Sequence, residues 1–396
     1  MQASHLEYIL RKILVHSNNI SDINITEGHP FQAEIDGQLT PVYFEPEIDK
    51  LTPFQTQAIA ISLIRTNRRL LRSLLTTGSC DLSYSISGRA RFRVNIFSQQ
   101  GKYTVVMRRL ENSIRTLEEL NLPKPFYQMA GEKNGIIFVS GATGSGKSTT
   151  LAAILDEINN TKPVHVVTLE DPVEYIHPPK MGTFNQRELG SDFHDFASGL
   201  RAAMRQAPKV ILVGEARDRE TLEIALAAAE TGHLVFATIH ASDAGTTISR
   251  ILGFFEPEEE RQIRVRLAGV MRWVVSQRLL PQTGGGRVAA MEIMGSTLLI
   301  KDIITNGETE DKTFYNAIAS MRPMGFQTFD QNILDLFDQK LISEETAMVF
   351  SSKKSIVGRG LDTIKAQAGQ IESLDDRLTL ESEEESAASP QAVAVL

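Results

Sequence analysis

The sequence predicts an α/β protein with an N-terminal α+β domain and a larger domain built on a mainly parallel sheet. Four runs, GIIFVSG, VHVVTLE, VILVGE and LVFATIH, are continuously apolar and rich in β-branched residues, as strands buried on both faces require. Helical patterns lie between these runs, and such alternation is typical of a parallel sheet covered by helices. Before them, short strand-like runs are separated by turn signals, which favours a separate first domain.

The first domain is predicted to span residues 1–110. Its opening helix has one apolar face, which we expect to be part of the core: Leu6, Ile9, Leu10, Ile13 and Leu14. Alternating patterns then predict strands at 22–26, 32–35, 81–86, 91–97 and 103–108, with a turn at Asp36-Gly37 and a helix over 56–75. Residues 111–125, which contain Pro123 and Pro125, are interpreted as a linker.

The second domain is predicted to span residues 126–355, with a turn at 284–286, a strand at 287–294 and helices over 298–350. One apolar helix face is formed by Phe329, Ile333, Leu336, Phe337 and Leu341. Residues 356–396 are polar and then acidic, with Arg377 as the one basic residue beyond Ala366. This composition predicts a disordered acidic tail.

Composition narrows the class of protein. A chain of 396 residues suits two or three domains, and its net charge of −8 argues against a broad nucleic-acid-binding surface. Its single cysteine, Cys80, excludes an internal disulfide and a four-cysteine zinc site. Arg11 and Lys12 interrupt the N-terminal apolar pattern, and no run reaches the roughly 18 to 20 apolar residues of a membrane span. We therefore expect a cytoplasmic protein that meets a membrane only through partners.

A phosphate-binding loop is the strongest motif in the chain. The segment GATGSGKS matches G-x-x-x-x-G-K-[ST] between a predicted strand and a predicted helix, the context that this motif requires. Backbone N–H groups would hold ATP phosphates, Lys147 would reach the β- and γ-phosphates, and the Ser148 hydroxyl would bind Mg²⁺. The predicted nucleotide-binding residues are Gly141, Ala142, Thr143, Gly144, Ser145, Gly146, Lys147, Ser148 and Thr149.

Hydrolysis also needs carboxylates, and two strand ends supply them. Glu170 ends VHVVTLE and Glu215 follows VILVG. Because the carboxyl ends of parallel strands meet at one edge of a sheet, both side chains are expected beside the phosphate loop. Glu215 resembles a Walker B acid and is the second candidate metal ligand. Each glutamate could instead cap a helix or lie on the surface.

Two histidines flank the run LVFATI. His240 follows it, on the edge expected to carry the phosphate loop, and is a candidate sensor of the γ-phosphate. His233 precedes the run. A separate metal site is not expected, because no His, Cys and carboxylate cluster has ligand spacing.

The chain resembles the secretion ATPase superfamily of type II and type IV pilus motors, and within it the PilT/PilU-type pilus retraction ATPases. The resemblance extends from about residue 5 to residue 350. Several motifs carry it, in the family's order: SDINITEGHP, RARFRVNIF, GATGSGKSTTLAAILDEIN, VTLEDPVEYIH, QAPKVILVGEARDRET, AAAETGHLVFATIHASDA and QRLLPQTGGGRVAAMEIM.

The resemblance implies an N-terminal PAS-like domain and a C-terminal RecA-like ATPase domain, assembled as a homo-hexamer with ATP at or near subunit interfaces. It implies that Glu170 is the catalytic carboxylate, that Glu215 is the Walker B acid, and that His240 and His233 belong to the family's histidine motifs. Arg93 and Arg108 match arginines that contact phosphate from a neighbouring domain or subunit. The implied cofactors are ATP and Mg²⁺. The implied partners are an inner-membrane pilus platform protein and a sibling retraction ATPase.

The chain departs from the family pattern at three places. Ala142 stands where proline is common, and the segment LLIKDIITNG at 298–307 replaces the retraction motif AIRNLIRE, which leaves open a PilU-like accessory motor. The acidic tail is the third departure. A type IV secretion or conjugation motor and a RecA-like nucleic-acid motor are the alternatives, and the acidic net charge argues against the second. Assembly ATPases usually carry paired CxxC motifs, and this branch is disfavoured because only Cys80 is present.

Overall fold

The computed structural model describes residues 3–17, 19–45, 48–111 and 113–367. Contacts divide the chain into two compact units. The first contains the residues up to Ile137 together with Ser148–Thr238, and the second contains Phe138–Lys147 together with the residues from Ile239 on. The predicted fold class is confirmed, because the chain forms one antiparallel sheet and one mainly parallel sheet with helices.

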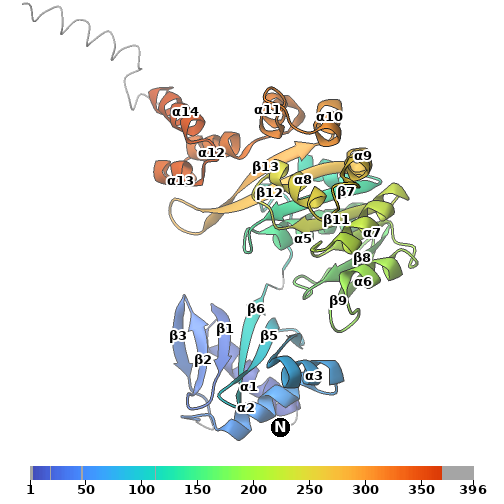
Figure 1. Cartoon of the computed structure of the whole chain (residues 1–396). Coiled ribbons are helices and arrows are strands. Elements are labelled where there is room, and N and C mark those ends of the chain that lie inside the picture. Colours follow the sequence, from blue (N-terminus) through green and yellow to red (C-terminus); the bar gives the residue numbers. More distant parts are fainter. Residues whose placement is uncertain (1–2, 18, 46–47, 112, 368–396) are drawn as a thin grey trace, which may run out of the picture. The chain divides into compact units, whose positions relative to one another are not determined.

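The N-terminal sheet has six strands in the order β3-β2-β1-β6-β5-β4. Every neighbouring pair in it is antiparallel. Its strands, blue to cyan in Figure 1, are β1 (Ile20–Ile25), β2 (Phe31–Ile35), β3 (Gln38–Val42), β4 (Ser79–Ile86), β5 (Ala90–Gln99) and β6 (Lys102–Leu110). Helices α1 (Ala3–His16), α2 (Pro53–Ile64) and α3 (Arg68–Thr77) accompany this sheet.

The predicted apolar face of the first helix is confirmed as core. Leu6, Leu10 and Ile13 are fully buried in one cluster with residues of β1, β5 and β6. The predicted helix over 56–75 is two helices, because Arg65 takes a positive φ of 53° after α2 and Asn67 caps α3. Gln38–Val42 was not predicted as a strand, since most of its side chains are exposed and leave little apolar pattern.

The second sheet has seven strands in the order β13-β12-β7-β11-β10-β8-β9. Pairs β8–β9, β8–β10 and β10–β11 are parallel, whereas β12–β13 is an antiparallel hairpin. The bounds are β7 (Gly135–Gly141), β8 (His165–Glu170), β9 (Thr183–Glu188), β10 (Val210–Val213), β11 (Leu234–Ile239), β12 (Met271–Pro281) and β13 (Arg287–Gly295). All side chains of β7, β10 and β11 are buried, as their apolar runs predicted.

Helices connect these strands. They are α4 (Pro125–Gly131), α5 (Lys147–Thr161), α6 (Phe196–Ala203), α7 (Arg219–Glu230), α8 (Ala244–Leu252) and α9 (Glu260–Val270). Aspartate side chains at Asp195, Asp218 and Asp243 accept backbone N–H groups and start α6, α7 and α8. These caps fix where each crossover helix leaves the strand before it.

The C-terminal helices are α10 (Leu298–Asn306), α11 (Phe314–Ser320), the short 3₁₀ helix Arg322–Met324, α12 (Phe329–Asp338), α13 (Glu344–Phe350) and α14 (Lys354–Gln367). The predicted apolar face beginning at Phe329 is part of a core cluster with Val357 and Leu361 of α14. The tail expected from residue 356 therefore begins as packed helix, because two apolar side chains one turn apart are buried. Residues 368–396, where the acidic composition falls, lie outside the described residues.

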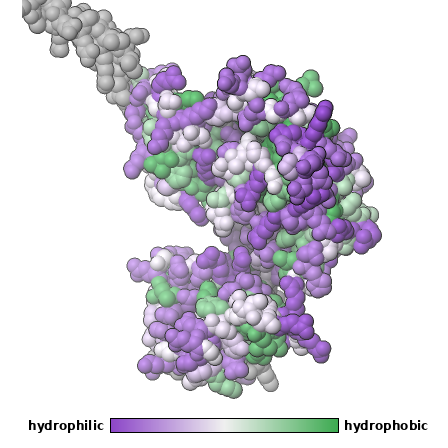
Figure 2. Space-filling model, in the orientation of Figure 1, coloured by the Kyte–Doolittle hydropathy of each residue, from purple (hydrophilic) through white to green (hydrophobic). Residues whose placement is uncertain are grey.

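The visible surface in Figure 2 is mostly hydrophilic, with apolar groups scattered among polar ones. Across the part of the chain that the structure describes, every helix is too short or too polar to cross a membrane.

Candidate active site

The predicted phosphate loop connects β7 to α5. Gly141, Gly144 and Gly146 have φ values of 147°, 77° and 91°, a backbone conformation that glycine adopts without strain. A Cβ atom at Gly141 would lie 2.5 Å from Ser145 Oγ and 2.6 Å from the carbonyl oxygen of Gln277, so the first position of the motif requires glycine. The Lys147 ammonium donates to the carbonyl oxygens of Gly141 and Ala142, at 3.0 and 2.9 Å.

The loop residues fit a nucleotide phosphate. Ala142, Thr143 and Gly144 are exposed, and Ser148 is exposed at the first turn of α5. The 15-residue α5 places its positive helix end at the loop. The buried Ser145 hydroxyl has no hydrogen-bond partner within the described chain. Its Oγ can therefore form a hydrogen bond with a bound phosphate.

Glu170, the last residue of β8, is held by several hydrogen bonds. Its Oε1 accepts from Thr168 Oγ1 at 2.6 Å and from Gln186 Nε2 at 3.2 Å. Burial raises the pKa of Glu170, whereas hydrogen bonds from Thr168, Gln186 and the Glu174 backbone act in the opposite direction. A half-buried carboxylate with raised basicity suits a group that takes a proton from water.

Glu215 lies just beyond the neighbouring strand end. Val213 of β10 pairs with Leu169 of β8, so Glu170 at the end of β8 and Glu215, two residues beyond β10, lie at the ends of adjacent parallel strands. The Gly214 N–H donates to the Leu169 carbonyl at 2.7 Å, and a Cβ on Gly214 would be blocked by that oxygen. The structure thus places both predicted carboxylates at the same edge.

Glu215 also forms an ion pair with Arg217. The hydrogen bond from the guanidinium to this carboxylate raises the pKa of Arg217. The pairing was not predicted, although Arg217 stands in the quoted motif VILVGEARDRET. Because the Arg217 side chain is 66% exposed, it can leave the pair at small cost when Glu215 takes another partner.

The two histidines lie at opposite ends of β11. His240 follows the last residue of this strand, as predicted. His233 lies before it, where its ring contacts the Ala228 carbonyl at 3.0 Å and its own carbonyl accepts from the N–H of Gly135, the first residue of β7. The phosphate loop follows the last residue of β7. This geometry gives no support to a catalytic role for His233 in its own chain, and that assignment stays a prediction.

Arg93 and Arg108 are brought together on the N-terminal sheet. They are direct cross-strand partners on β5 and β6, and both are exposed. Arg108 Nε forms an ion pair with Asp22 Oδ1 at 2.9 Å. Two cations side by side repel one another unless an anion lies between them, so the pair is suited to a phosphate. Contact with nucleotide stays a prediction.

Arg91, two residues before Arg93, was missed. It donates to the carbonyl oxygens of Val173 and Glu174, in the segment that follows Glu170. Ser83 of β4 likewise donates to Glu188 of β9 at 2.6 Å. The signal for Arg91 was present in the motif RARFRVNIF, but the choice among its arginines needs the three-dimensional structure.

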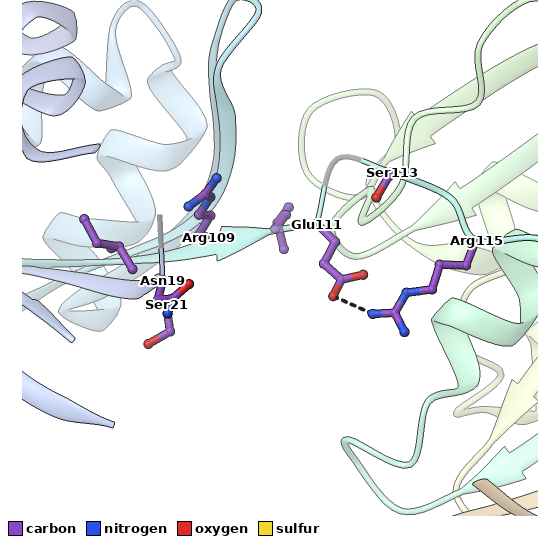
Figure 3. Close-up of a pocket in the computed structure, with 8 residues that line it drawn as sticks. Asn19, Ser21, Arg109, Glu111, Ser113 and Arg115 are labelled. Atoms are coloured by element: carbon purple, nitrogen blue, oxygen red, sulfur yellow. Dashed lines mark hydrogen bonds and ion pairs between the residues drawn. The ribbon is translucent and has the colours of Figure 1, made fainter. Parts of the chain in front are cut away.

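A pocket of about 600 Å³ lies where β6 continues into the predicted linker (Figure 3). Figure 3 shows the Arg115 side chain directed at Glu111, with which it forms an ion pair of 3.2 Å. The pocket shares no residue with the phosphate loop or its carboxylates, so it is not assigned to the nucleotide. Its lining residues are Asn19, Ile20, Ser21, Arg109, Leu110, Glu111, Ser113 and Arg115.

Among residues 3–367, apart from those not described, no group of three His, Cys, Asp or Glu side chains could hold a metal alone. Mg²⁺ commonly binds through one or two protein oxygens together with substrate phosphates and water. The Ser148 hydroxyl and the Glu215 carboxylate are donors of that kind.

The fold and this site define a P-loop protein of the secretion ATPase class. Residues 77–319 match the family model described as "Type II/IV secretion system protein". The chain belongs to this family.

Individual relatives agree with this assignment. The chain is 41% identical to the "Type IV pilus retractation ATPase PilT" of Pseudomonas aeruginosa over 83% of its length and 93% of the relative's. It is 36% identical to the "Type IV pilus ATPase PilU" of the same organism over 91% of the chain and 93% of the relative. A crystal structure titled as the pilus retraction motor PilT with bound ADP matches with a TM-score of 0.79 at 40% identity, over 89% of this chain and 98% of that one. The predicted resemblance to PilT/PilU-type proteins is confirmed.

Proposed function

We propose that this protein is a motor ATPase that hydrolyses ATP to retract type IV pili. The observation that carries the proposal is the phosphate loop between β7 and α5, together with Glu170 and Glu215 at the ends of adjacent strands. The similarity to PilT over most of both chains, and the ADP in the solved PilT structure, support it.

The chemistry assigned to each residue follows from its position. The loop N–H groups and Lys147 would hold the phosphates, and Ser148 and Glu215 would hold Mg²⁺, which would supply positive charge to the phosphoryl group. Glu170 orients a water molecule and accepts its proton. His240, at the end of β11, responds to loss of the γ-phosphate, and Arg93 and Arg108 approach the nucleotide of a neighbouring subunit.

The proposed assembly is a homo-hexamer in the cytoplasm, held at the inner membrane through a pilus platform protein. We keep residues 1–110 as the N-terminal domain and 111–125 as the linker, and we extend the ATPase domain to residue 367 because α14 packs on α12. ATP hydrolysis would change the orientation of one domain relative to the other, and this movement would turn the pilus platform protein.

Deleting the gene and imaging surface pili tests the proposal. We expect excess, unretracted pili, restored to normal by the wild-type chain but not by Lys147→Ala, because the variant cannot hold the phosphates. A deletion strain that loses its pili would contradict a retraction role and indicate an assembly motor.

A PilU-like accessory role is the second candidate, because the match to PilU covers more of this chain than the match to PilT. It would act beside a sibling retraction ATPase. In cells that keep an active sibling, Lys147→Ala would then leave retraction working and lower only its force.

A further inference from the structure

Gln186 of β9 uses its whole amide group to connect Glu170 with the segment that follows it. Its Nε2 donates to Glu170 Oε1 at 3.2 Å and to the Tyr175 carbonyl at 2.7 Å. Its Oε1 accepts the His177 N–H at 2.9 Å. Both N–H groups and the oxygen are therefore engaged, so the amide has one orientation rather than two.

The same segment is tied to the helix of the phosphate loop. The Tyr175 hydroxyl lies 2.9 Å from the Thr149 hydroxyl. Thr149 directly follows Ser148, the proposed Mg²⁺ ligand, at the first turn of α5. Hydrogen bonds thus run from Thr149 through Tyr175 and Gln186 to the carboxylate of Glu170.

We propose that Gln186 is a positioning residue, which fixes the direction of the Glu170 carboxylate and links it through Tyr175 to the phosphate loop. The inference rests on the proposed role of Glu170. In this proposal Gln186 does not contact the nucleotide or the attacking water. It orients the Glu170 carboxylate toward that water. Small displacements of a reacting group cost large factors in rate, so such a residue affects turnover more than binding.

The charges and hydrogen bonds around Glu170 help to set its pKa. A change in the pH profile of turnover can therefore distinguish a misplaced Glu170 from a loss of folded protein. The side-chain charge of Glu174 disfavours the charged form of Glu170, whereas the backbone hydrogen bond from Glu174 favours it. Arg91, which also faces Glu188, favours the charged form as well. The hydrogen bonds from Thr168 and Gln186 favour the carboxylate form as well. Removing the Gln186 donor should therefore raise the pH at which Glu170 becomes active.

The experiment measures ATP turnover of the full chain against pH for the wild type, Gln186→Leu and Thr168→Val. Thr168→Val removes the other hydrogen bond to Glu170 Oε1 with almost no change in shape at a fully buried position. The matched control is Asn185→Ala on the same strand, whose side chain is exposed and contacts His165 at 2.8 Å.

For Gln186→Leu we expect kcat to fall about 10- to 100-fold, with KM for ATP within about twofold of wild type. The acid limb of kcat should move to higher pH, because a hydrogen bond that favours the charged carboxylate is lost. Asn185→Ala should match the wild type. If Gln186→Leu does not fold, Thr168→Val provides the test. We expect it to lower kcat and to move the acid limb to higher pH.

An unchanged kcat in a folded Gln186→Leu protein would overturn the inference, and so would a lower kcat whose acid limb stays in place. An unchanged profile in Thr168→Val would do the same where Gln186→Leu fails to fold. Failure of the proposed function is distinguishable, because the wild type would then show no turnover or Glu170→Gln would retain all of it.

Discussion

Glu292 is a buried carboxylate that the proposed reaction does not use. It lies on β13 with 4% of its surface exposed, and its Oε1 accepts the N–H of Ala244, the first residue of α8, at 2.8 Å. Burial raises its pKa from 4.5 to about 7, and the nearby charge of Asp243 acts in the same direction. Arg278, whose guanidinium stacks on Phe329, opposes the shift.

This shift predicts a pH dependence of stability. Because the folded-state pKa of Glu292 is raised above its unfolded value, its contribution is fully present below pH 4.5 and is lost as the pH rises through about 7. The complete loss should be on the order of 3 kcal/mol. Glu292→Gln cannot ionise but keeps an acceptor for Ala244. We therefore expect its melting temperature to fall less between pH 5 and pH 8 than that of the wild type.

Exposed Glu258→Gln is the control for this comparison and should follow the wild-type curve. If Glu292→Gln loses stability over the same pH range by the same amount as the wild type, Glu292 is not the group responsible.

At the scale of single residues, the sequence could locate the phosphate loop and both strand-end glutamates because each is marked by a short contiguous pattern. Lys147, Ser148 and Glu170 follow from a motif and from the end of an apolar run. Gln186 and Arg217 could not be found in this way. Gln186 reaches Glu170 across a pair of parallel strands, and such contacts depend on register, which no local pattern reports.

At the scale of elements, predictions succeeded where a segment has a clear apolar or alternating pattern and failed where the local pattern is weak. Strands β7, β8, β10 and β11 follow from their continuous apolar runs. Edge strand β9, with the sequence TFNQRE, is mostly polar, and its assignment depends on pairing with β8. Strand β12 directly follows helix α9 without an intervening turn residue. The sequence therefore does not show where the helix ends and the strand begins.

Helix α14 is ordered although the polar composition from residue 356 predicted a disordered tail, because its apolar side chains are packed in a core. Leu361 is 1% exposed in the cluster that contains Phe329, Ile333 and Val357. We expect Leu361→Ala to destabilise the C-terminal helices by about 2 to 5 kcal/mol, because removing a buried leucine loses apolar contact and leaves a cavity. Thermal unfolding followed by circular dichroism measures the change.

The same substitution at an exposed position provides the comparison. Leu298 is 88% exposed, so Leu298→Ala should change stability by no more than about 0.5 kcal/mol. Equal effects of the two substitutions would show that α14 contributes no core to the fold.

At the scale of the whole molecule, the chain combines an antiparallel N-terminal sheet with the mainly parallel sheet that carries the phosphate loop. The chain belongs to the type II/IV secretion family, and we propose that it is an ATP-driven motor. A motor needs a site that distinguishes ATP from its products. The hydrogen bonds that connect Thr149 to Glu170 through Tyr175 and Gln186 supply a physical route by which the phosphate loop can affect the carboxylate that we propose to be catalytic.

Phosphate release from Mg–ATP by the purified chain, measured together with ATP binding, tests the central claim most directly. The wild type should turn over, and Glu170→Gln should bind ATP with similar affinity while losing at least about 100-fold in kcat, because the proton acceptor is gone. Lys147→Ala should lose binding, and Glu258→Gln should behave as wild type. Full turnover by Glu170→Gln would contradict the account.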